Sequence, residues 1–206
     1  MRYVGPLGLL MALLAGPAFA DLSEDGRICV DPRNRQAQIT ACTRLIGARE
    51  IGPRNQAIAH NNRANAYIRQ GLRGRAIADY NAAIRLNPKY ANAYLNLGLT
   101  YRELGDYQLY LLHCNKAIEA APRHARAYAC RAWARYKMGQ PAKGESDAGK
   151  AVKLDPRCAD CWETRAHILE ALGRKQAAIA DFRKALRLDP AAGRSRAGLR
   201  RLGAGN

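Results

Sequence analysis

The six cysteines are the residues best equipped for chemistry in this sequence of 206 residues. Cys158 and Cys161 form a Cys-Ala-Asp-Cys motif. This spacing suits a local disulfide, a thioredoxin-like redox centre or half of a zinc site. A redox centre of that kind needs a βαβ context, which the sequence lacks. A zinc site needs further ligands, of which His167 is one candidate. We therefore expect a structural disulfide, with thiol redox or metal binding as the alternatives.

The amino terminus indicates the compartment in which these cysteines work. Arg2 gives a positive start, residues 4–14 are apolar, and Ala18-Phe19-Ala20 is a small-x-small cleavage pattern. This arrangement is typical of a secretory signal peptide that is cut before Asp21. The apolar run is shorter than the roughly 20 residues that span a membrane, and no later segment is apolar enough. We expect a periplasmic or secreted protein with no transmembrane segment after cleavage.

Cys29 and Cys42 lie on either side of a short stretch near the start of the mature chain. Residues 32–49 are predicted to form a helix, with Cys42 on its apolar side. In an oxidising compartment, a disulfide between the two cysteines would pin the extended segment before this helix onto it. Closing a loop of this size contributes about 3 kcal/mol to stability.

No set of residues typical of catalysis is present. The four histidines, His60, His113, His124 and His167, are scattered along the chain. The sequence contains no Gly-rich phosphate loop, no His-Glu-x-x-His zinc motif and no Gly-x-Ser-x-Gly nucleophile elbow. We therefore expect a protein that is not an enzyme and that uses no cofactor and no catalytic metal.

The chain is strongly basic, with 34 Lys and Arg against 17 Asp and Glu. In a cytosolic protein, this balance would first suggest RNA. For an exported protein, the available anionic neighbours are envelope polymers, lipid headgroups and acidic proteins, so we expect no nucleic-acid partner. Charge alone speaks to solubility and loose association. Both a solubilising role and contact with an anionic envelope surface stay open.

A period of 34 residues organises the rest of the chain. Pro88, Pro122, Pro156 and Pro190 recur at this spacing, and each follows an apolar, helix-like ending. A glycine lies midway in each period, at positions 71, 105, 139 and 173. Glycine commonly follows a helix end, and proline stops a helix. Each period therefore predicts a helix pair: 57–70 with 73–86, 91–104 with 107–120, 125–138 with 141–154, and 159–172 with 175–188.

This pattern resembles the tetratricopeptide repeat (TPR) family. The residues that carry the resemblance are small and aromatic: Ala64, Tyr67, Ala76, Tyr80 and Ala83; Tyr94, Leu97, Gly98, Tyr101 and Gly105; Tyr128, Ala132, Ala148 and Ala151; Trp162, Ala166, Ala178, Phe182 and Ala185. The stretches Ala41–Ile46 and Asn61–Tyr67 also resemble exported TPR proteins of alphaproteobacteria. The resemblance covers essentially the whole mature chain.

The resemblance implies an all-α fold, a right-handed α-solenoid of four tandem TPR helix pairs with N- and C-terminal capping helices. The expected divisions are a signal peptide at 1–20, an N-terminal segment and capping helix at 21–56, repeats at 57–90, 91–124, 125–158 and 159–192, and a C-terminal capping helix and tail at 193–206. The last helix is predicted within residues 191–202. A polar terminal helix closes the last layer of a solenoid.

Some positions depart from the family pattern. Tyr110 stands where the second repeat should have Ala, in an unusually apolar helix, so either the packing is looser there or an apolar patch faces outward. Arg135 stands where the third repeat should have an aromatic residue, and Gly144 replaces a small Ala. We expect the third repeat to be the least regular. The stacking of TPR helices also brings Cys114 near Cys130, either as a disulfide or as two buried thiols.

In TPR proteins, the first helix of each pair lines a concave groove that holds peptides. By this resemblance, the groove residues are Asn61, Asn65, Asn92, Asn96, Leu99, Arg126, Trp133 and Lys137, with His167 and Glu170 in the last layer. Asn65, Asn96 and Arg126 coincide with part of the carboxylate clamp of chaperone-binding TPR domains. Asn61 and Cys130 replace a Lys and an Arg of that clamp, so a complete clamp is not expected.

The sequence thus predicts a non-enzymatic interaction scaffold or adaptor in the cell envelope, which binds a peptide or protein segment in its groove. The first alternative is a basic protein that binds an envelope polymer or a membrane surface. The second is thiol redox or metal chemistry at Cys158 and Cys161.

Overall fold

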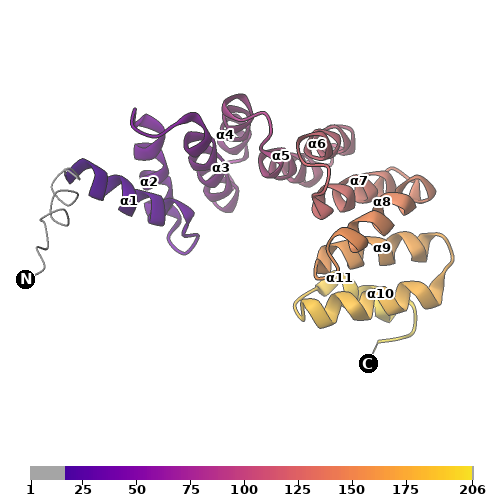
Figure 1. The fold of residues 1–206 in the computed structure, drawn as a ribbon. Helices are drawn as coiled ribbons and strands as arrows, with labels where there is room; N and C mark the ends of the chain where they lie inside the picture. The colour runs from indigo at the N-terminus through magenta and orange to yellow at the C-terminus, as the bar shows by residue number, and fades with distance from the viewer. Residues whose placement is uncertain (1–16, 206) are drawn as a thin grey trace, which may run out of the picture. The chain divides into compact units, whose positions relative to one another are not determined.

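The computed structural model describes residues 17–205, which form eleven α-helices and no strand (Figure 1). The chain divides into two compact units, Met1–Asn87 and Pro88–Asn206. Most of the expected signal peptide lies outside the described residues. No helix within residues 17–205 combines the length and hydropathy that crossing a membrane requires.

The first unit contains α1 (Pro17–Val30), α2 (Arg35–Gly47), α3 (Pro53–Arg69) and α4 (Arg73–Leu86). The side chain of Asn34 caps α2 by accepting a hydrogen bond from the backbone N of Ala37, over 3.0 Å. Helices α1, α2 and α3 pack around Cys29, Ala41, Cys42, Leu45 and Ala59, which are all buried. Helix α4 then packs along α3.

The segment before residue 32 differs from the prediction. We expected an extended segment there, and the structure shows α1. Residues 17–20 belong to the expected signal peptide, so only residues 21–30, which include Gly26, were left to indicate a helix. The stabilising contacts of this helix are tertiary: Cys29 is bonded to Cys42, and the buried carboxylate of Asp25 pairs with Arg44 of α2, whose side chain is exposed.

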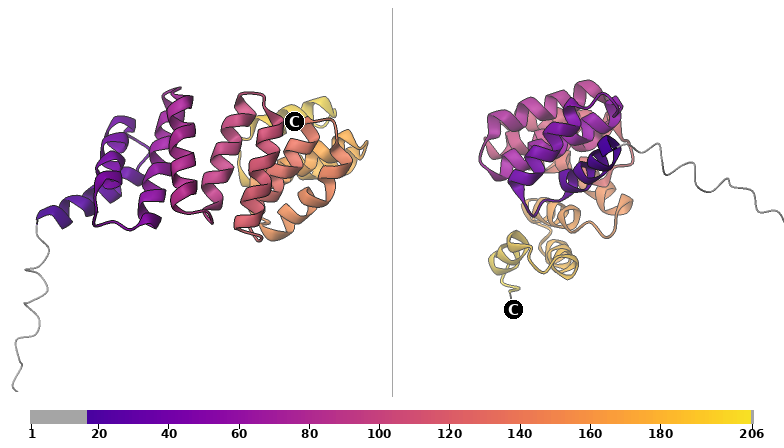
Figure 2. Two further views of the ribbon diagram at one scale, coloured as in Figure 1. Left: turned by 90° about the horizontal axis from the view of Figure 1, so that it is seen from above. Right: turned by 90° about the vertical axis from the view of Figure 1, so that its left-hand side faces the viewer.

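The second unit contains α5 (Ala91–Glu103), α6 (Tyr107–Ala120), α7 (Ala125–Lys137), α8 (Pro141–Leu154), α9 (Ala159–Ala171), α10 (Lys175–Leu188) and α11 (Gly193–Arg201). The views in Figure 2 show successive helices lying side by side, and the pairs α5–α6, α7–α8 and α9–α10 pack along their length. Helix α11 packs mainly on α10 and also touches α9.

The predicted helix pairs are confirmed almost residue by residue. Helices α4, α6, α8 and α10 begin and end at the predicted residues, while α5, α7 and α9 end one residue earlier. Helix α3 begins at Pro53 rather than at residue 57. The glycine after the first helix of each pair has a positive φ, from 75° at Gly139 and Gly173 to 80° at Gly105. Residues with a Cβ rarely adopt this conformation, which explains why glycine recurs there.

Small residues set the close approach of the two helices in a pair. Ala64 and Ala76, and Ala166 and Ala178, are fully buried at this contact. In the α5–α6 pair, Gly98 leaves the space that the buried ring of Tyr110 occupies, since a Cβ on Gly98 would lie 3.3 Å from that ring. The packing at Tyr110 is therefore not loose, although Leu112 on the same helix is exposed.

The third repeat is not irregular, and that prediction is wrong. Helices α7 and α8 have 13 and 14 residues, as do the helices of the second and fourth repeats. Gly144 lets α8 approach α7 so closely that an added Cβ would lie 2.9 Å from the carbonyl oxygen of Ala132. Arg135, in the aromatic position, instead pairs with Asp147 across the two helices, over 2.9 Å.

Candidate functional site

The cysteines lie in three bonded pairs. Cys29 is joined to Cys42, Cys114 to Cys130, and Cys158 to Cys161, with Cα–Cα distances of 4.9, 5.6 and 5.3 Å. The Cys114–Cys130 bond ties α6 to α7, the pairing that the stacking of repeats left open against free thiols.

Cys158 and Cys161 mark the start of α9. Cys158 is the residue that caps this helix, and its Sγ accepts from the backbone N of Cys161 over 3.2 Å. Cys161 is fully buried. Within residues 17–205, no group of three or more His, Cys, Asp and Glu side chains is placed to hold a metal ion. The geometry therefore fits the structural disulfide expected at this motif.

Two predicted groove residues belong to α3 in the first unit. Asn61 is only 4 % exposed, so it is not available to a ligand. Asn65 is half-buried, and its Oδ1 accepts a hydrogen bond from the Tyr80 hydroxyl over 2.7 Å. Both amides therefore take part in the packing of α3, and Asn65 retains only partial access to solvent.

In the second unit, the predicted residues of α5 and α7 are placed differently. Asn92 is exposed, with its Oδ1 3.1 Å from Nε2 of His124. Arg126 is exposed and pairs with Asp160 of α9 over 3.4 Å. Asn96 is half-buried, and Leu99 packs against the core that contains Tyr110. The clamp position at Cys130 is taken up by a disulfide, so these residues do not form a carboxylate clamp.

The last two predicted residues, Trp133 and Lys137 of α7, line a cavity of about 510 Å³. Three helices supply its walls: α7, α9 and α11. The other lining residues are Tyr136, His167, Glu170, Ala171, Arg194 and Arg201. In this cavity, called the Trp133 cavity below, side chains from separate helices of the second unit converge on one hollow that is open to solvent.

Aromatic rings form one wall of the Trp133 cavity. The Trp133 ring lies 5.1 Å from that of Tyr136 and 5.2 Å from that of His167, the latter edge-on. The far side of His167 meets Phe182 of α10, edge-on at 4.9 Å. Aromatic pairs favour such tilted and edge-on arrangements, so the rings hold each other in place.

Cations surround these rings. The guanidinium carbon of Arg194 lies 5.0 Å from the centre of the Trp133 ring, within cation–π range. Arg194 also pairs with the buried carboxylate of Glu163 over 2.6 Å, and Ser195 donates to the other oxygen of Glu163 over 2.7 Å. Arg201 holds Glu170 through two hydrogen bonds of 3.0 and 2.6 Å. These contacts fix both arginines at the cavity rim.

His167 is the unusual group of this site. Its side chain is buried, and neither ring nitrogen has a hydrogen-bond partner. Burial lowers its pKa to about 4, and the charges of Arg201, Arg194 and Lys137 act in the same direction while Glu170 opposes them. The imidazole is therefore neutral at pH 7 and carries one N–H donor without an acceptor. Buried polar groups in proteins are usually satisfied, so this exception needs an explanation.

Trp133, Lys137, His167 and Glu170 are groove residues predicted from the sequence, whereas Arg194 and Arg201 were expected only as part of a basic terminal helix. These two arginines are seven residues apart in the short terminal helix, a spacing that places them on one helix face. That spacing was a usable signal for a basic face. It could not reveal that the face turns toward α7 and α9.

Sequence profiles of the TPR family match most of the repeat region. Two profiles described as Tetratricopeptide repeat match residues 57–90 and 131–193, and one described as TPR repeat matches residues 74–108. The chain is a tetratricopeptide repeat protein. No curated protein sequence matches it significantly. The predicted fold class, an all-α solenoid of helix pairs, is confirmed; its handedness stays a prediction.

Several solved structures resemble this TPR protein. A thermophilic TPR protein in Thermus thermophilus matches with a TM-score of 0.68 and 20% identity, covering 88% of this chain and 98% of that one. A tetratricopeptide repeat protein from Parabacteroides merdae matches with a TM-score of 0.69 and 19% identity, covering 91% and 73%. The first TPR of Spaghetti (RPAP3), bound to the HSP90 peptide SRMEEVD, matches with a TM-score of 0.50 and 25% identity, covering 55% and 90%.

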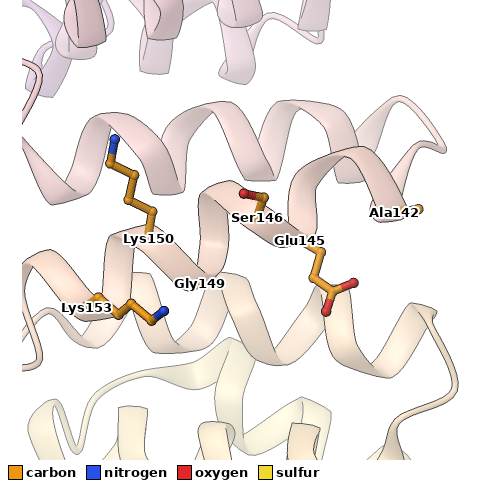
Figure 3. A pocket seen from close by; sticks show the side chains of 6 residues that line it. All are labelled: Ala142, Glu145, Ser146, Gly149, Lys150 and Lys153. Carbon is orange, nitrogen blue, oxygen red and sulfur yellow. The ribbon is translucent and has the colours of Figure 1, made fainter.

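A second hollow of this TPR protein, of about 630 Å³, lies along α8, the second helix of the third repeat. Figure 3 shows its lining side chains, which all project from that one helix: Ala142, Glu145, Ser146, Gly149, Lys150 and Lys153. Glu145 is engaged by Arg174, and Lys150 donates to the Tyr128 hydroxyl over 2.7 Å. No ring lines this hollow, so we regard the Trp133 cavity as the candidate site.

Proposed function

We propose that this TPR protein is a non-enzymatic adaptor that holds a peptide or protein segment against α7, α9 and α11. The observation that carries the proposal is the Trp133 cavity, where an indole ring and cations from two helices face the same space. Trp and Arg are the residue types that most often dominate binding energy at protein interfaces. TPR proteins are interaction scaffolds, and the Trp133 cavity would give this scaffold a specific binding site for a partner.

One structural relative supports the peptide class of partner. The first TPR of Spaghetti (RPAP3) is described as bound to an HSP90 peptide, and its match extends over 55% of this chain. The HSP90 peptide itself is not proposed as the partner of the present chain, because two positions of the carboxylate clamp are altered in this chain. Asn61 is buried and Cys130 is bonded to Cys114.

We further propose that the adaptor works outside the cytoplasm, in the periplasm or after secretion. The three disulfides support this location, since disulfides persist in oxidising compartments. The signal-like residues 1–20 support it independently. Fractionation of cells that express the full chain tests the location, and mature protein beginning at Asp21 in the soluble envelope fraction is the expected result.

Site-specific photocrosslinking tests the proposed function. A benzoylphenylalanine placed at Lys137, an exposed position on the cavity rim, should capture a partner from intact cells, to be identified by mass spectrometry. The matched control carries the same group at Lys153, an exposed lysine on α8. Crosslinks to the same protein from Lys153 alone would contradict the proposed binding surface.

The alternative, binding to an anionic envelope polymer or membrane surface, rests on the net charge of +17. It predicts retention on anionic vesicles that disappears at modest salt, because exposed charges are screened over about 10 Å at 0.1 M. Retention that does not respond to salt would rule this alternative out.

A further inference from the structure

The Trp133 cavity has an excess of positive charge. Lys137, Arg194 and Arg201 face it from α7 and α11, while Glu170 is the carboxylate in its lining. Glu163 lies behind Arg194 and is buried. Lys137 is exposed, and its Nζ lies 5.8 Å from the centre of the Tyr107 ring of α6. Among the ion pairs of residues 17–205, none joins a carboxylate to Lys137. An anionic group entering the cavity would therefore meet one ammonium without a carboxylate and two positioned guanidinium groups.

The arginines retain donors for such a group. A guanidinium carries five N–H donors in a planar fork. Arg201 directs its Nε and Nη2 to Glu170, and Arg194 directs its Nη2 to Glu163. Since these ion pairs hold both side chains in place, little side-chain entropy remains to be lost when the other N–H groups bind a ligand.

His167 provides a second, independent indication of a ligand. It is only 6 % exposed, lines the cavity, and has no hydrogen-bond partner for either nitrogen. Leaving a buried donor unsatisfied costs about 1–3 kcal/mol. Its Nδ1 lies 3.7 Å from a carboxylate oxygen of Glu170, which is beyond hydrogen-bonding distance. A ligand carboxylate oxygen that came within hydrogen-bonding distance of the ring N–H would remove that cost, because it is a strong acceptor.

The aromatic rings of the cavity favour an anion that also carries an apolar group. Trp133 and Tyr136 give the cavity an apolar wall next to its cations. A polyphosphate or an acidic polysaccharide offers charge without apolar groups, and it would leave this wall without a partner. A peptide can place a carboxylate beside an aliphatic side chain, and so can use both.

We propose that the Trp133 cavity binds a carboxylate of an acidic partner peptide, with a neighbouring aliphatic side chain of that peptide packed on the Trp133 and Tyr136 rings. The proposal rests on the proposed function and names the chemistry of its partner. The carboxylate is that of a Glu or Asp side chain or of a chain terminus.

Tryptophan fluorescence of the full mature chain tests the proposal. The sequence has two tryptophans, so Trp162→Phe leaves Trp133 as the reporter. The probes are acetyl-Gly-Glu-Leu-Gly-amide and its neutral counterpart acetyl-Gly-Gln-Leu-Gly-amide. The Glu peptide should change the fluorescence saturably and bind about tenfold more tightly than the Gln peptide, as expected for one charge-assisted contact. A third peptide, acetyl-Gly-Gln-Leu with a free carboxyl terminus, tests whether the cavity also binds a terminal carboxylate.

Two variants and one control variant locate the binding. Lys137→Ala should weaken the Glu peptide about tenfold, while Lys153→Ala, which removes the same charge from α8, should not change its affinity. His167→Phe keeps a ring of similar size beside Phe182 and should weaken the Glu peptide without loss of helicity. Circular dichroism on each variant verifies that it is folded.

Three outcomes would overturn the proposal. One is equal affinity for the Glu and Gln peptides, and another is equal weakening by Lys137→Ala and Lys153→Ala. The third is sodium polyphosphate acting as strongly as the Glu peptide, which would indicate general anion binding. If crosslinking from Lys137 captures a partner while these peptides fail, the proposed function survives without this inference. If the peptides bind and crosslinking captures nothing, the chemistry of the cavity stands and the proposed function fails.

Discussion

Arg131 of α7 donates two hydrogen bonds to Asp147 of α8, Nε to Oδ2 over 2.7 Å and Nη2 to Oδ1 over 2.8 Å. Arg63 with Asp79, and Arg165 with Asp181, form the same bridge in the first and fourth repeats. The second repeat has Leu97 and His113 at these positions, and His113 stacks on Tyr101 at 5.4 Å instead. The bridge therefore joins the two helices within each of the first, third and fourth repeats. In the second repeat, an aromatic packing contact takes its place.

The first prediction concerns this bridge. Asp147→Ala should lower the free energy of unfolding by about 2–4 kcal/mol, because it leaves Arg131 and Arg135 without their shared, buried partner. Urea unfolding followed by circular dichroism measures the loss. The double variant Arg131→Leu with Asp147→His copies the pair of the second repeat and should lose less than Asp147→Ala alone. A double variant that is less stable than the single one would show that the bridge cannot be exchanged between repeats.

The second prediction compares two glycines of α8. Gly144→Ala should destabilise the protein by about 1–3 kcal/mol, because its Cβ would lie 2.9 Å from the backbone oxygen of Ala132, which cannot easily move. Gly149→Ala is the matched control, since no atom lies within 4 Å of its added Cβ. Alanine is the better helix former, so this variant should gain up to about 1 kcal/mol. Thermal unfolding of both variants gives the comparison, and equal effects would show that α8 does not depend on the close approach at Gly144.

The repeat fold follows from the sequence because its signals are local and periodic. Pro88 and Gly105 mark helix ends through backbone geometry alone, and their recurrence fixes the helix pairs. The Arg131–Asp147 bridge also has a signal in the sequence, the recurrence of Arg and Asp sixteen residues apart in three repeats.

Other features depend on contacts between segments that no local pattern describes. Helix α1 is held by a disulfide and by the pairing of Asp25 with Arg44, and these contacts with α2 cannot be read from the sequence of α1 itself. The Trp133 cavity depends on α11 turning Arg194 and Arg201 toward α7 and α9. The burial of Asn61 depends on its neighbours in the fold. The resemblance to TPR proteins predicted Asn61 as a groove residue and therefore did not predict this burial.

The third prediction concerns pH. His167 has a pKa of about 4 in the folded protein and an ordinary value of 6.5 when unfolded. Between these values the unfolded state binds the proton and the folded state does not, so stability present above pH 6.5 is lost as the pH falls toward 4. The loss from this group should be about 2–3 kcal/mol. Urea unfolding at pH 7, 5.5 and 4.5 measures it.

The control for this pH dependence is His167→Phe. The pKa values of His113 and His124 are also lowered by burial, so part of the slope should persist in the variant. At pH 7 the variant should be at least as stable as the wild type, because it removes a buried ring with two unpartnered nitrogens. An unchanged slope would mean that His167 is protonated, or hydrated, in the folded protein.

The fourth prediction concerns the Cys114–Cys130 disulfide, which ties α6 of the second repeat to α7 of the third. Repeat proteins are held together by contacts between neighbours, so a covalent bond at one junction couples two layers that would otherwise open separately. Replacing both cysteines by Ala should cost about 3 kcal/mol, the value for a loop of roughly 15 residues.

Thiol counting on the unreduced, denatured wild type should find no free thiol. The matched control is Cys158→Ala with Cys161→Ala, which opens a much shorter loop at the start of α9 and should cost less. If the two double variants lose the same stability, the link between α6 and α7 has no special part in holding the layers together.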